Sequence, residues 1–213
     1  MVAAARDAAT RRLLAFGLAD LVALARPLVG LGGLRENPRT VRPGRVFPDP
    51  HDPRFDFGAR GGEWIDAIAT RAARACDACG DRVIGHSDWR AEHVRVEAGR
   101  LSAVYDWDSL SIAREPIIVG QAAHAFTMDW ENPKRQQLPT LAEALGFIAD
   151  YQGARGTAFS RAERRAARAA LVSTMAYCAR CEHSDASRAG ATAVRDGSAR
   201  AFLEAHADAL LTD

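Results

Sequence analysis

The chain has 213 residues, of which 48% are hydrophobic and 26% are charged, a balance typical of a packed globular protein. Its net charge is only +1, so no overall field draws it to nucleic acid, and we expect no nucleic-acid partner. No stretch approaches the roughly 18 apolar residues that a membrane span needs. Asp7 and Gly17 interrupt the N-terminal apolar run, which therefore lacks the form of a signal peptide. We predict a soluble, cytoplasmic protein without a membrane partner, folded as a single domain over residues 1–213.

The four cysteines form two pairs with the same spacing, Cys76 with Cys79 and Cys178 with Cys181. Two such pairs can hold zinc, but both lie in segments of helical periodicity and lack the glycine-rich turns that present zinc thiolates. We therefore expect reduced thiols in a reducing compartment. A zinc-stabilised structural domain is the weaker alternative.

Residues 8–26 carry apolar side chains at helical spacing, and Pro27 ends this predicted amphipathic helix. Residues 27–62 then form a long loop, and six of the nine prolines lie before Phe57. A loop of this length inside a compact domain is either a functional lid or an extended wrap over the surface. The prolines favour an ordered, extended path.

Helical spacing returns from Trp64 to Cys79, and Gly80 stands where a left-handed cap would end that helix. Farther along, Pro116 suits the first turn of a helix that we expect to run to about Trp130.

Two later helices have clear starting signals. Thr140 with Glu143, and Ser160 with Glu163, match the capping-box spacing ahead of apolar runs. A last helix is expected over residues 198–211. No alternation of strand and helix suggests a parallel sheet. The predicted class is therefore mainly α (α+β), with one small β-hairpin.

That hairpin lies in the stretch from Val83 to Leu110, VIGHSDWRAEHVRVEAGRLSAVYDWDSL, which holds the densest set of chemically active residues in the chain. If residues 98–99 form the turn, Glu97 faces Arg100, and farther from the turn Arg95 faces Ser102 and His93 faces Val104. This register places five apolar side chains on one face. The other face is polar, with Val104 as its one apolar member.

The predicted register brings His93 and Asp106 to one face, diagonal to each other at about 7 Å between backbones. Asp88 precedes His93 by five residues, at the same end of the hairpin. A carboxylate there could act as a general base, and His93 with Asp106 could hold a divalent cation. The alternative for His93 is a polar residue on an exposed face. Trp89 and Trp107 are interpreted as packing residues.

The run His86-Ser-Asp88, the strand pair after it and the element Asp106-Trp-Asp108 resemble the catalytic and metal-binding loops of the aminoglycoside phosphotransferases. That family shares its protein-kinase-like fold with the choline kinases. The helix before the loop, the proline-containing turn and helix after it, and the C-terminal helices are also similar to the family's helical C-terminal lobe. The resemblance covers nearly the whole chain.

The resemblance implies a role for each of these residues. Asp88 would orient and deprotonate an acceptor hydroxyl, Asp106 would bind the Mg²⁺ that bridges the phosphates of ATP, and His86 would brace the loop. His93 stands where the family has a metal-binding Asn, and an imidazole suits magnesium less well than an amide oxygen. Asp108 would contact substrate or support the metal ligands.

The chain departs from the family in one respect. A glycine-rich loop and a strand lysine should precede the catalytic loop, but the chain's one lysine, Lys134, follows Asp106, and the glycines at 30–33 lack flanking strand signals. We therefore expect a C-terminal lobe without its N-terminal nucleotide lobe: a truncated small-molecule phosphotransferase, inactive in isolation, with no nucleotide-binding residues assignable. The alternative is a catalytically inactive, pseudokinase-like binding module.

The acceptor is expected to be a small molecule with a hydroxyl group, which the sequence does not identify. Its candidate recognition acids, Asp129, Glu131, Glu182 and Asp185, have the same pattern as surface charge. A face left open by the missing lobe would favour a homo-oligomer.

Overall fold

The computed structural model describes residues 7–37, 41, 44–76, 79–130, 132, 137–190 and 194–212. Over these residues the chain forms six α-helices and two small sheets, so the mainly α (α+β) class expected from the sequence is confirmed. Lys134 and Glu131 lie outside the described residues. None of the described helices combines the length and the apolar character needed to cross a membrane.

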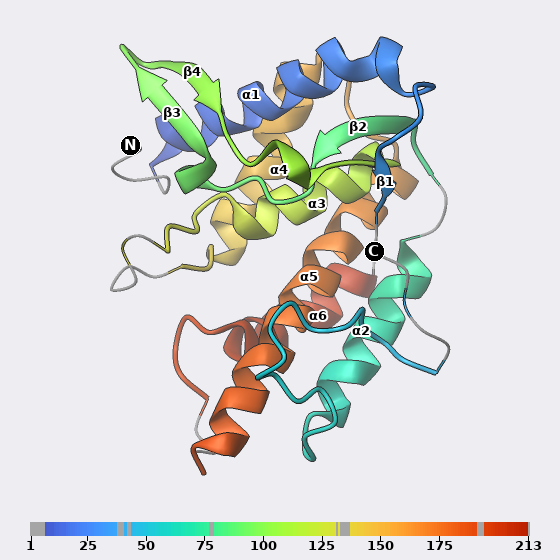
Figure 1. Cartoon of the computed structure of the whole chain (residues 1–213), viewed down its shortest axis with the longest axis vertical. Helices are drawn as coiled ribbons and strands as arrows, with labels where there is room; N and C mark the ends of the chain where they lie inside the picture. Colours follow the sequence, from blue (N-terminus) through green and yellow to red (C-terminus); the bar gives the residue numbers. More distant parts are fainter. Residues whose placement is uncertain are drawn as a thin grey trace.

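The longest helix, α5, is the packing axis of the molecule (Figure 1). Helices α2, α3 and α6 contact α5, while α1 packs against α4. The bounds are α1 Ala8–Ala25, α2 Glu63–Ala75, α3 Glu115–Ala125, α4 Leu141–Arg155, α5 Arg161–Arg188 and α6 Ala199–Thr212.

Both predicted capping boxes are present. Thr140 Oγ1 accepts from Glu143 N at 3.2 Å, and Glu143 Oε2 accepts from Thr140 N at 2.7 Å. Ser160 and Glu163 make the same reciprocal pair at 3.2 and 2.7 Å. Each box satisfies two backbone donors that the first turn of a helix leaves unpaired. Local chemistry thus determines where α4 and α5 begin.

Two helix ends differ from the prediction. Helix α2 ends at Ala75 rather than Cys79, and Gly80, at φ +81°, lies in the turn that leads into the next strand. Helix α3 ends at Ala125 rather than near Trp130. Beyond Ala125, side-chain and backbone groups of Gln137 bond to the chain: Asp129 N donates to Gln137 Oε1 at 2.7 Å. After Ala125, hydrogen bonds to Gln137 therefore take the place of further helical hydrogen bonds.

Two small sheets are built from five strands, of which β1 is very short: β1 Arg35–Glu36, β2 Arg82–His86, β3 Val94–Glu97, β4 Arg100–Val104 and β5 Leu110–Arg114. Strand β5 pairs antiparallel with β2 and parallel with β1, while β3 and β4 form the hairpin. The sheet around β5 was not anticipated, because its strands are short and their apolar runs lack alternation. Its β2–β5 pair sets the position of the candidate site.

The predicted hairpin register is correct only next to the turn. Ala98 and Gly99 both have positive φ, as a two-residue hairpin turn of type I′ requires, and Glu97 faces Arg100. A bulge between Arg95 and Val96 then shifts the pairing, so that Val94 rather than His93 faces Val104. The bulge puts both of these valines against the core, which explains the one apolar residue left on the predicted polar face. His93 instead ends the short 3-10 helix Ala91–His93.

Two apolar clusters fill the interior. The first joins α1, α3 and α4 and includes the fully buried Trp89 and Phe147; the second joins α2, α5 and α6 around residues such as Met175. Figure 1 shows α1 and the hairpin at one end of the long axis, with α2 and the C-terminal half of α5 towards the other. The functional residues from the central stretch lie at the end built on the first cluster.

The described part of the proline-rich loop wraps over α5. His51 N donates to Tyr177 Oη at 2.8 Å, and Asp56 N donates to Ser184 Oγ at 2.7 Å. The buried guanidinium of Arg180 donates to the carbonyl groups of residues 57 and 59. A Cβ at Gly62 would lie 1.5 Å from Arg180 Nη1, so a side chain there would push the guanidinium away from the carbonyl groups that it binds.

The two cysteine pairs border different parts of the interior. Cys76 packs against the first cluster and Cys178 against the second. Burial raises the pKa of both thiols of the second pair, that of Cys181 to about 12. Among the described residues, the one group of side chains close enough to share a metal contains no cysteine.

Candidate functional site

The candidate site forms where the chain leaves β2 and β4. Asp88 follows β2 by two residues, and Asp106 follows β4 by two residues. The backbone N and the side-chain Oγ of Ser87 both donate to Ser109 O at 2.9 Å, which ties the two loops together. The β2–β5 pairing therefore brings the loops of the two acids together, whereas the sequence predicted that the hairpin would bring Asp106 to His93, with Asp88 in the approach loop.

His86 bridges the two loops from inside the molecule. Its ring is fully buried; Nε2 donates to Tyr105 O at 3.0 Å, and Nδ1 accepts from Asp88 N at 3.3 Å. Burial lowers the pKa of this imidazole, so it is neutral at physiological pH. Both ring nitrogens are thus used in bracing the loops.

His93 lies between the two carboxylates. Its Nδ1 donates to Asp88 O at 2.9 Å and lies 4.0 Å from Asp88 Oδ2 and 3.6 Å from Asp106 Oδ2. Its Nε2 accepts from Arg90 Nη2 at 2.9 Å, an assignment that follows from the partners of each nitrogen. The predicted meeting of His93 with Asp106 occurs, but His93 reaches it from the 3-10 helix rather than from a strand.

Asp106 is held in an unusual backbone conformation. Its φ of 60° and ψ of 46° are left-handed, a region that Asp tolerates better than most residues. Ser109 Oγ donates to Asp106 Oδ2 at 2.6 Å, and this hydrogen bond is the main cause that holds the pKa of the carboxyl below its ordinary value. The side chain is 30% exposed, so an ionised carboxylate faces the surface at neutral pH.

Arg90 is the residue that the sequence interpretation missed. Its guanidinium contacts Asp88 Oδ2 at 2.9 Å and Glu92 Oε1 at 2.7 Å in addition to His93. Glu92 also accepts from Trp130 N at 2.7 Å, which anchors this group to the chain after α3. The available signal was an arginine two residues from an acid on each side, in a segment too short for a helix.

The hydrogen bonds made by the imidazole rings of His86 and His93 decide whether these rings can bind a metal ion. His86, His93 and Asp106 present atoms within 4.8 Å of one another, close enough to share an ion. In this arrangement neither imidazole offers a free lone pair, because one nitrogen of each ring donates and the other accepts. The carboxylates of Asp88 and Asp106 are partly exposed and oxygen-based. With both imidazoles occupied, Asp106 is the member of this group left to bind an ion, and a carboxylate oxygen is a ligand that hard cations prefer.

The remaining members of the stretch have different environments. Asp108 has an exposed side chain, and its carbonyl accepts from Arg35 Nη2 at 2.6 Å. Trp89 is a packing residue as expected: it is fully buried and its Nε1 donates to Leu14 O at 3.1 Å. Trp107 is not, because it is 56% exposed in the turn that follows the left-handed residue Asp106.

The described candidates for acceptor recognition have structural partners. Glu182 accepts from the backbone N of Ala199 at 2.9 Å and so caps α6. Asp185 pairs with Arg188 at 2.6 Å, and the buried Asp129 accepts from Asn132 at 2.7 Å. These three acids stabilise local structure.

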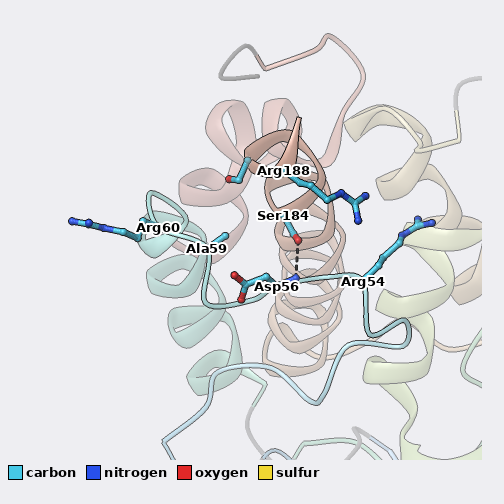
Figure 2. Close-up of a pocket in the computed structure, with 7 residues that line it drawn as sticks. Arg54, Asp56, Ala59, Arg60, Ser184 and Arg188 are labelled. Carbon is cyan, nitrogen blue, oxygen red and sulfur yellow. Dashed lines mark hydrogen bonds between the residues drawn. The ribbon is translucent and has the colours of Figure 1, made fainter. Parts of the chain in front are cut away.

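Two surface hollows lie along the proline-rich loop. One of about 540 Å³ lies between this loop and the C-terminal end of α5, and another of about 450 Å³ is lined by residues 44–50 and 55–58 with Asp66. Figure 2 shows the first, with Asp56 bonded to Ser184 and with Arg60 pointing away from Arg54 and Arg188. Its arginines do not converge on a common point.

Neither the scan against protein-family models nor the search of curated proteins finds a match for this chain.

Proposed function

We propose that this chain supplies the acceptor-binding and metal-binding part of an ATP-dependent phosphotransferase that acts on a hydroxyl group of a small molecule, of the aminoglycoside phosphotransferase type. The observation that supports the proposal is the convergence of two carboxylates on one imidazole. Asp88 and Asp106 each place an oxygen within 4.0 Å of His93 Nδ1. Phosphoryl transfer needs an acid that positions the attacking hydroxyl beside an acid that holds a metal.

Asp88 is suited to the role of base. Its backbone is held on both sides, since its N–H donates to His86 and its carbonyl accepts from His93. Its side chain remains 39% exposed, so an acceptor hydroxyl can approach it. In the proposed reaction Asp88 orients that hydroxyl and accepts its proton as the oxygen bonds to the terminal phosphorus of ATP; the bond from that phosphorus to the ADP oxygen breaks and ADP leaves.

Asp106 is suited to hold magnesium. Ser109 binds one carboxylate oxygen and keeps the group ionised, and the left-handed backbone aims it to the same side as Asp88. Asp106 would hold Mg²⁺, which would supply positive charge to stabilise the negative charge that develops during phosphoryl transfer. Asp108, exposed two residues later, is proposed to contact the substrate.

The proposal includes a cytoplasmic location, because ATP is the phosphoryl donor there. Cys178 and Cys181 form no disulfide, as is usual in a reducing compartment.

A second candidate is a noncatalytic binding module of the pseudokinase kind. One observation favours it: Arg90 is paired with the proposed base. In this case the loops after β2 and β4 would bind a small molecule without transfer.

The test measures Mg²⁺-dependent transfer from radiolabelled ATP to a panel of small molecules with hydroxyl groups. It uses the chain alone and the chain fused behind a kinase-type nucleotide lobe. Asp88→Asn is expected to lower transfer by about 10²- to 10⁴-fold, the usual contribution of a general base. The matched control is Asp208→Asn, since Asp208 is an 85% exposed acid on α6. It should leave transfer unchanged.

Two results would contradict the proposal. Transfer that survives Asp88→Asn removes the role assigned to Asp88. Saturable binding of a small molecule with no transfer in either form favours the binding module.

A further inference from the structure

The guanidinium of Arg90 lies among acids next to the group that could share a metal, His86, His93 and Asp106. It contacts Asp88 at 2.9 Å, Glu92 at 2.7 Å and the Nε2 of His93 at 2.9 Å. The Arg90 side chain is only 17% exposed, and its Nε is buried with no hydrogen-bond partner among the residues that the structure describes. These contacts hold the positively charged guanidinium of Arg90 among negatively charged carboxylates.

The electrostatics of the cluster require a cation. Asp88, Glu92 and Asp106 each carry a carboxylate, whereas His86 is neutral and the Nε2 of His93 accepts a hydrogen bond. Repulsion between like charges at these distances is costly in a partly buried position. Arg90 is positively charged and contacts Asp88 and Glu92 directly. It therefore neutralises their negative charge in the folded chain, as a bound divalent ion would also do.

We propose that Arg90 is a latch that competes with a divalent cation for this site. This inference rests on the proposed function, because it describes how the activity of that same site is regulated. When Arg90 is seated, it pairs with the Asp88 carboxylate and occupies the lone pair of His93. A cation that binds at Asp106 lies beside Nδ1 of His93, whereas Arg90 contacts Nε2 of the same ring, so the cation repels the guanidinium from across the ring and its departure frees Asp88 to accept a proton. Binding of the metal is therefore coupled to release of Asp88 from Arg90.

The latch predicts a measurable reduction of metal affinity. If the seated state makes up about 90% of the molecules, the apparent affinity of the open state for metal is lowered about tenfold. Removal of the charge also leaves the carboxylates unneutralised, which further favours a divalent ion.

The experiment titrates Mn²⁺ alone into the full chain and follows binding by electron paramagnetic resonance. Mn²⁺ prefers the same oxygen ligands as Mg²⁺. Arg90→Gln, which keeps a donor but removes the charge, is expected to bind Mn²⁺ at least about tenfold more tightly than the parent chain. Arg90→Lys, which keeps the charge, is expected to stay near the parent.

The matched control is Arg95→Gln, which removes the charge of an arginine that is 58% exposed and paired with Glu97 at 2.6 Å. A similar gain in this variant would show a general charge effect and overturn the latch. Asp106→Asn in the Arg90→Gln background must abolish the tight binding; retention would place the metal elsewhere and also overturn it. Circular dichroism establishes that each variant is folded.

The other outcomes separate the two proposals. Binding by the parent chain that is equal to or tighter than binding by Arg90→Gln overturns the latch and leaves the phosphotransferase proposal standing. Absence of Mn²⁺ binding in both folded proteins overturns the latch together with the metal-binding role of Asp106.

Discussion

Asp88 and Glu115 are both carboxylates paired with an arginine, but one lies at the surface and the other is sealed in the core. Glu115 is 1% exposed and accepts from Tyr151 Oη at 2.8 Å and from Arg155 Nε and Nη2 at 2.8 and 3.1 Å. Asp88 is 39% exposed, and one nitrogen of Arg90 contacts it at 2.9 Å.

The difference is in how completely each charge is satisfied. Arg155 binds Glu115 through two nitrogens, and the hydroxyl of Tyr151 completes the set, so this group holds α3 to α4 and has no capacity to exchange partners. Arg90 is shared among several acceptors, and water reaches Asp88. A fully satisfied buried pair stabilises the fold, whereas an open and shared pair can take part in chemistry. The following predictions test this distinction.

The largest effect is expected at the sealed pair. Glu115→Ala should lower the free energy of unfolding by about 3 to 5 kcal/mol, because it leaves the guanidinium of Arg155 without its carboxylate in a mostly buried position. Urea denaturation followed by circular dichroism measures the change. Glu97→Ala, at an exposed pair with Arg95, is the control and should cost no more than about 0.5 kcal/mol. A loss below about 1 kcal/mol at Glu115 would show that the two pairs do not differ as argued.

An unpaired buried group should reveal itself through pH. His124 is 3% exposed, neither ring nitrogen has a hydrogen-bond partner within the described part of the chain, and burial lowers its pKa from 6.5 to about 4. Between these two values the unfolded chain binds a proton that the folded chain does not. The contribution of the neutral His124 to the free energy of unfolding is therefore fully present above about pH 6.5. The free energy of unfolding should fall by up to about 3 kcal/mol as the pH drops towards 4.

The check is the pH dependence of urea unfolding in His124→Leu. This variant should flatten the slope between pH 6.5 and 4, although the buried His86 contributes a slope of the same sign that persists. An unaltered slope in His124→Leu would assign the acid sensitivity to other groups.

A smaller effect is expected at the connection between the candidate site and the core. Trp89→Phe removes the hydrogen bond from the indole to Leu14 O and leaves a small void beside Gly17. We expect a loss of about 1 to 2 kcal/mol in the free energy of unfolding. Thermal and urea denaturation of the variant measure it. No measurable loss would mean that the loop holding Asp88 is not anchored through its neighbour.

The smallest effect on stability is expected at Asp88 itself. Asp88→Asn should change the free energy of unfolding by no more than about 0.5 kcal/mol, because the carboxylate is partly solvated and its arginine retains two other acceptors. The same urea experiment measures this change. A loss as large as that of Glu115→Ala would assign Asp88 to the fold rather than to chemistry.

The parts that could be predicted from the sequence are those governed by neighbouring residues. The start of α4 depends on Thr140 and Glu143, three residues apart, and the turn of the hairpin depends on Ala98 and Gly99. The ends of α2 and α3 could not be predicted equally well. The chain beyond α3, for instance, bonds to Gln137, a partner whose position depends on the fold around it.

The candidate site shows the same division. Asp88, His93 and Asp106 were identified from residue type and spacing, and the structure brings them together. The reason given for their meeting was wrong, because a bulge alters the hairpin register and the β2–β5 pair joins the two loops. Arg90 was overlooked because an arginine flanked by acids is common on solvated surfaces.

The sequence by itself determined the helical class, the capped starts of α4 and α5, and the residue types able to perform chemistry in the central stretch. Each of these depends on side chains within a few positions of one another. The tertiary structure decided which partners those residues have: that both nitrogens of His86 and of His93 are occupied, that Arg90 neutralises Asp88, and that Glu115 rather than Asp88 is the sealed acid. These outcomes depend on burial and on contacts between separate strands and helices, which sequence spacing does not encode.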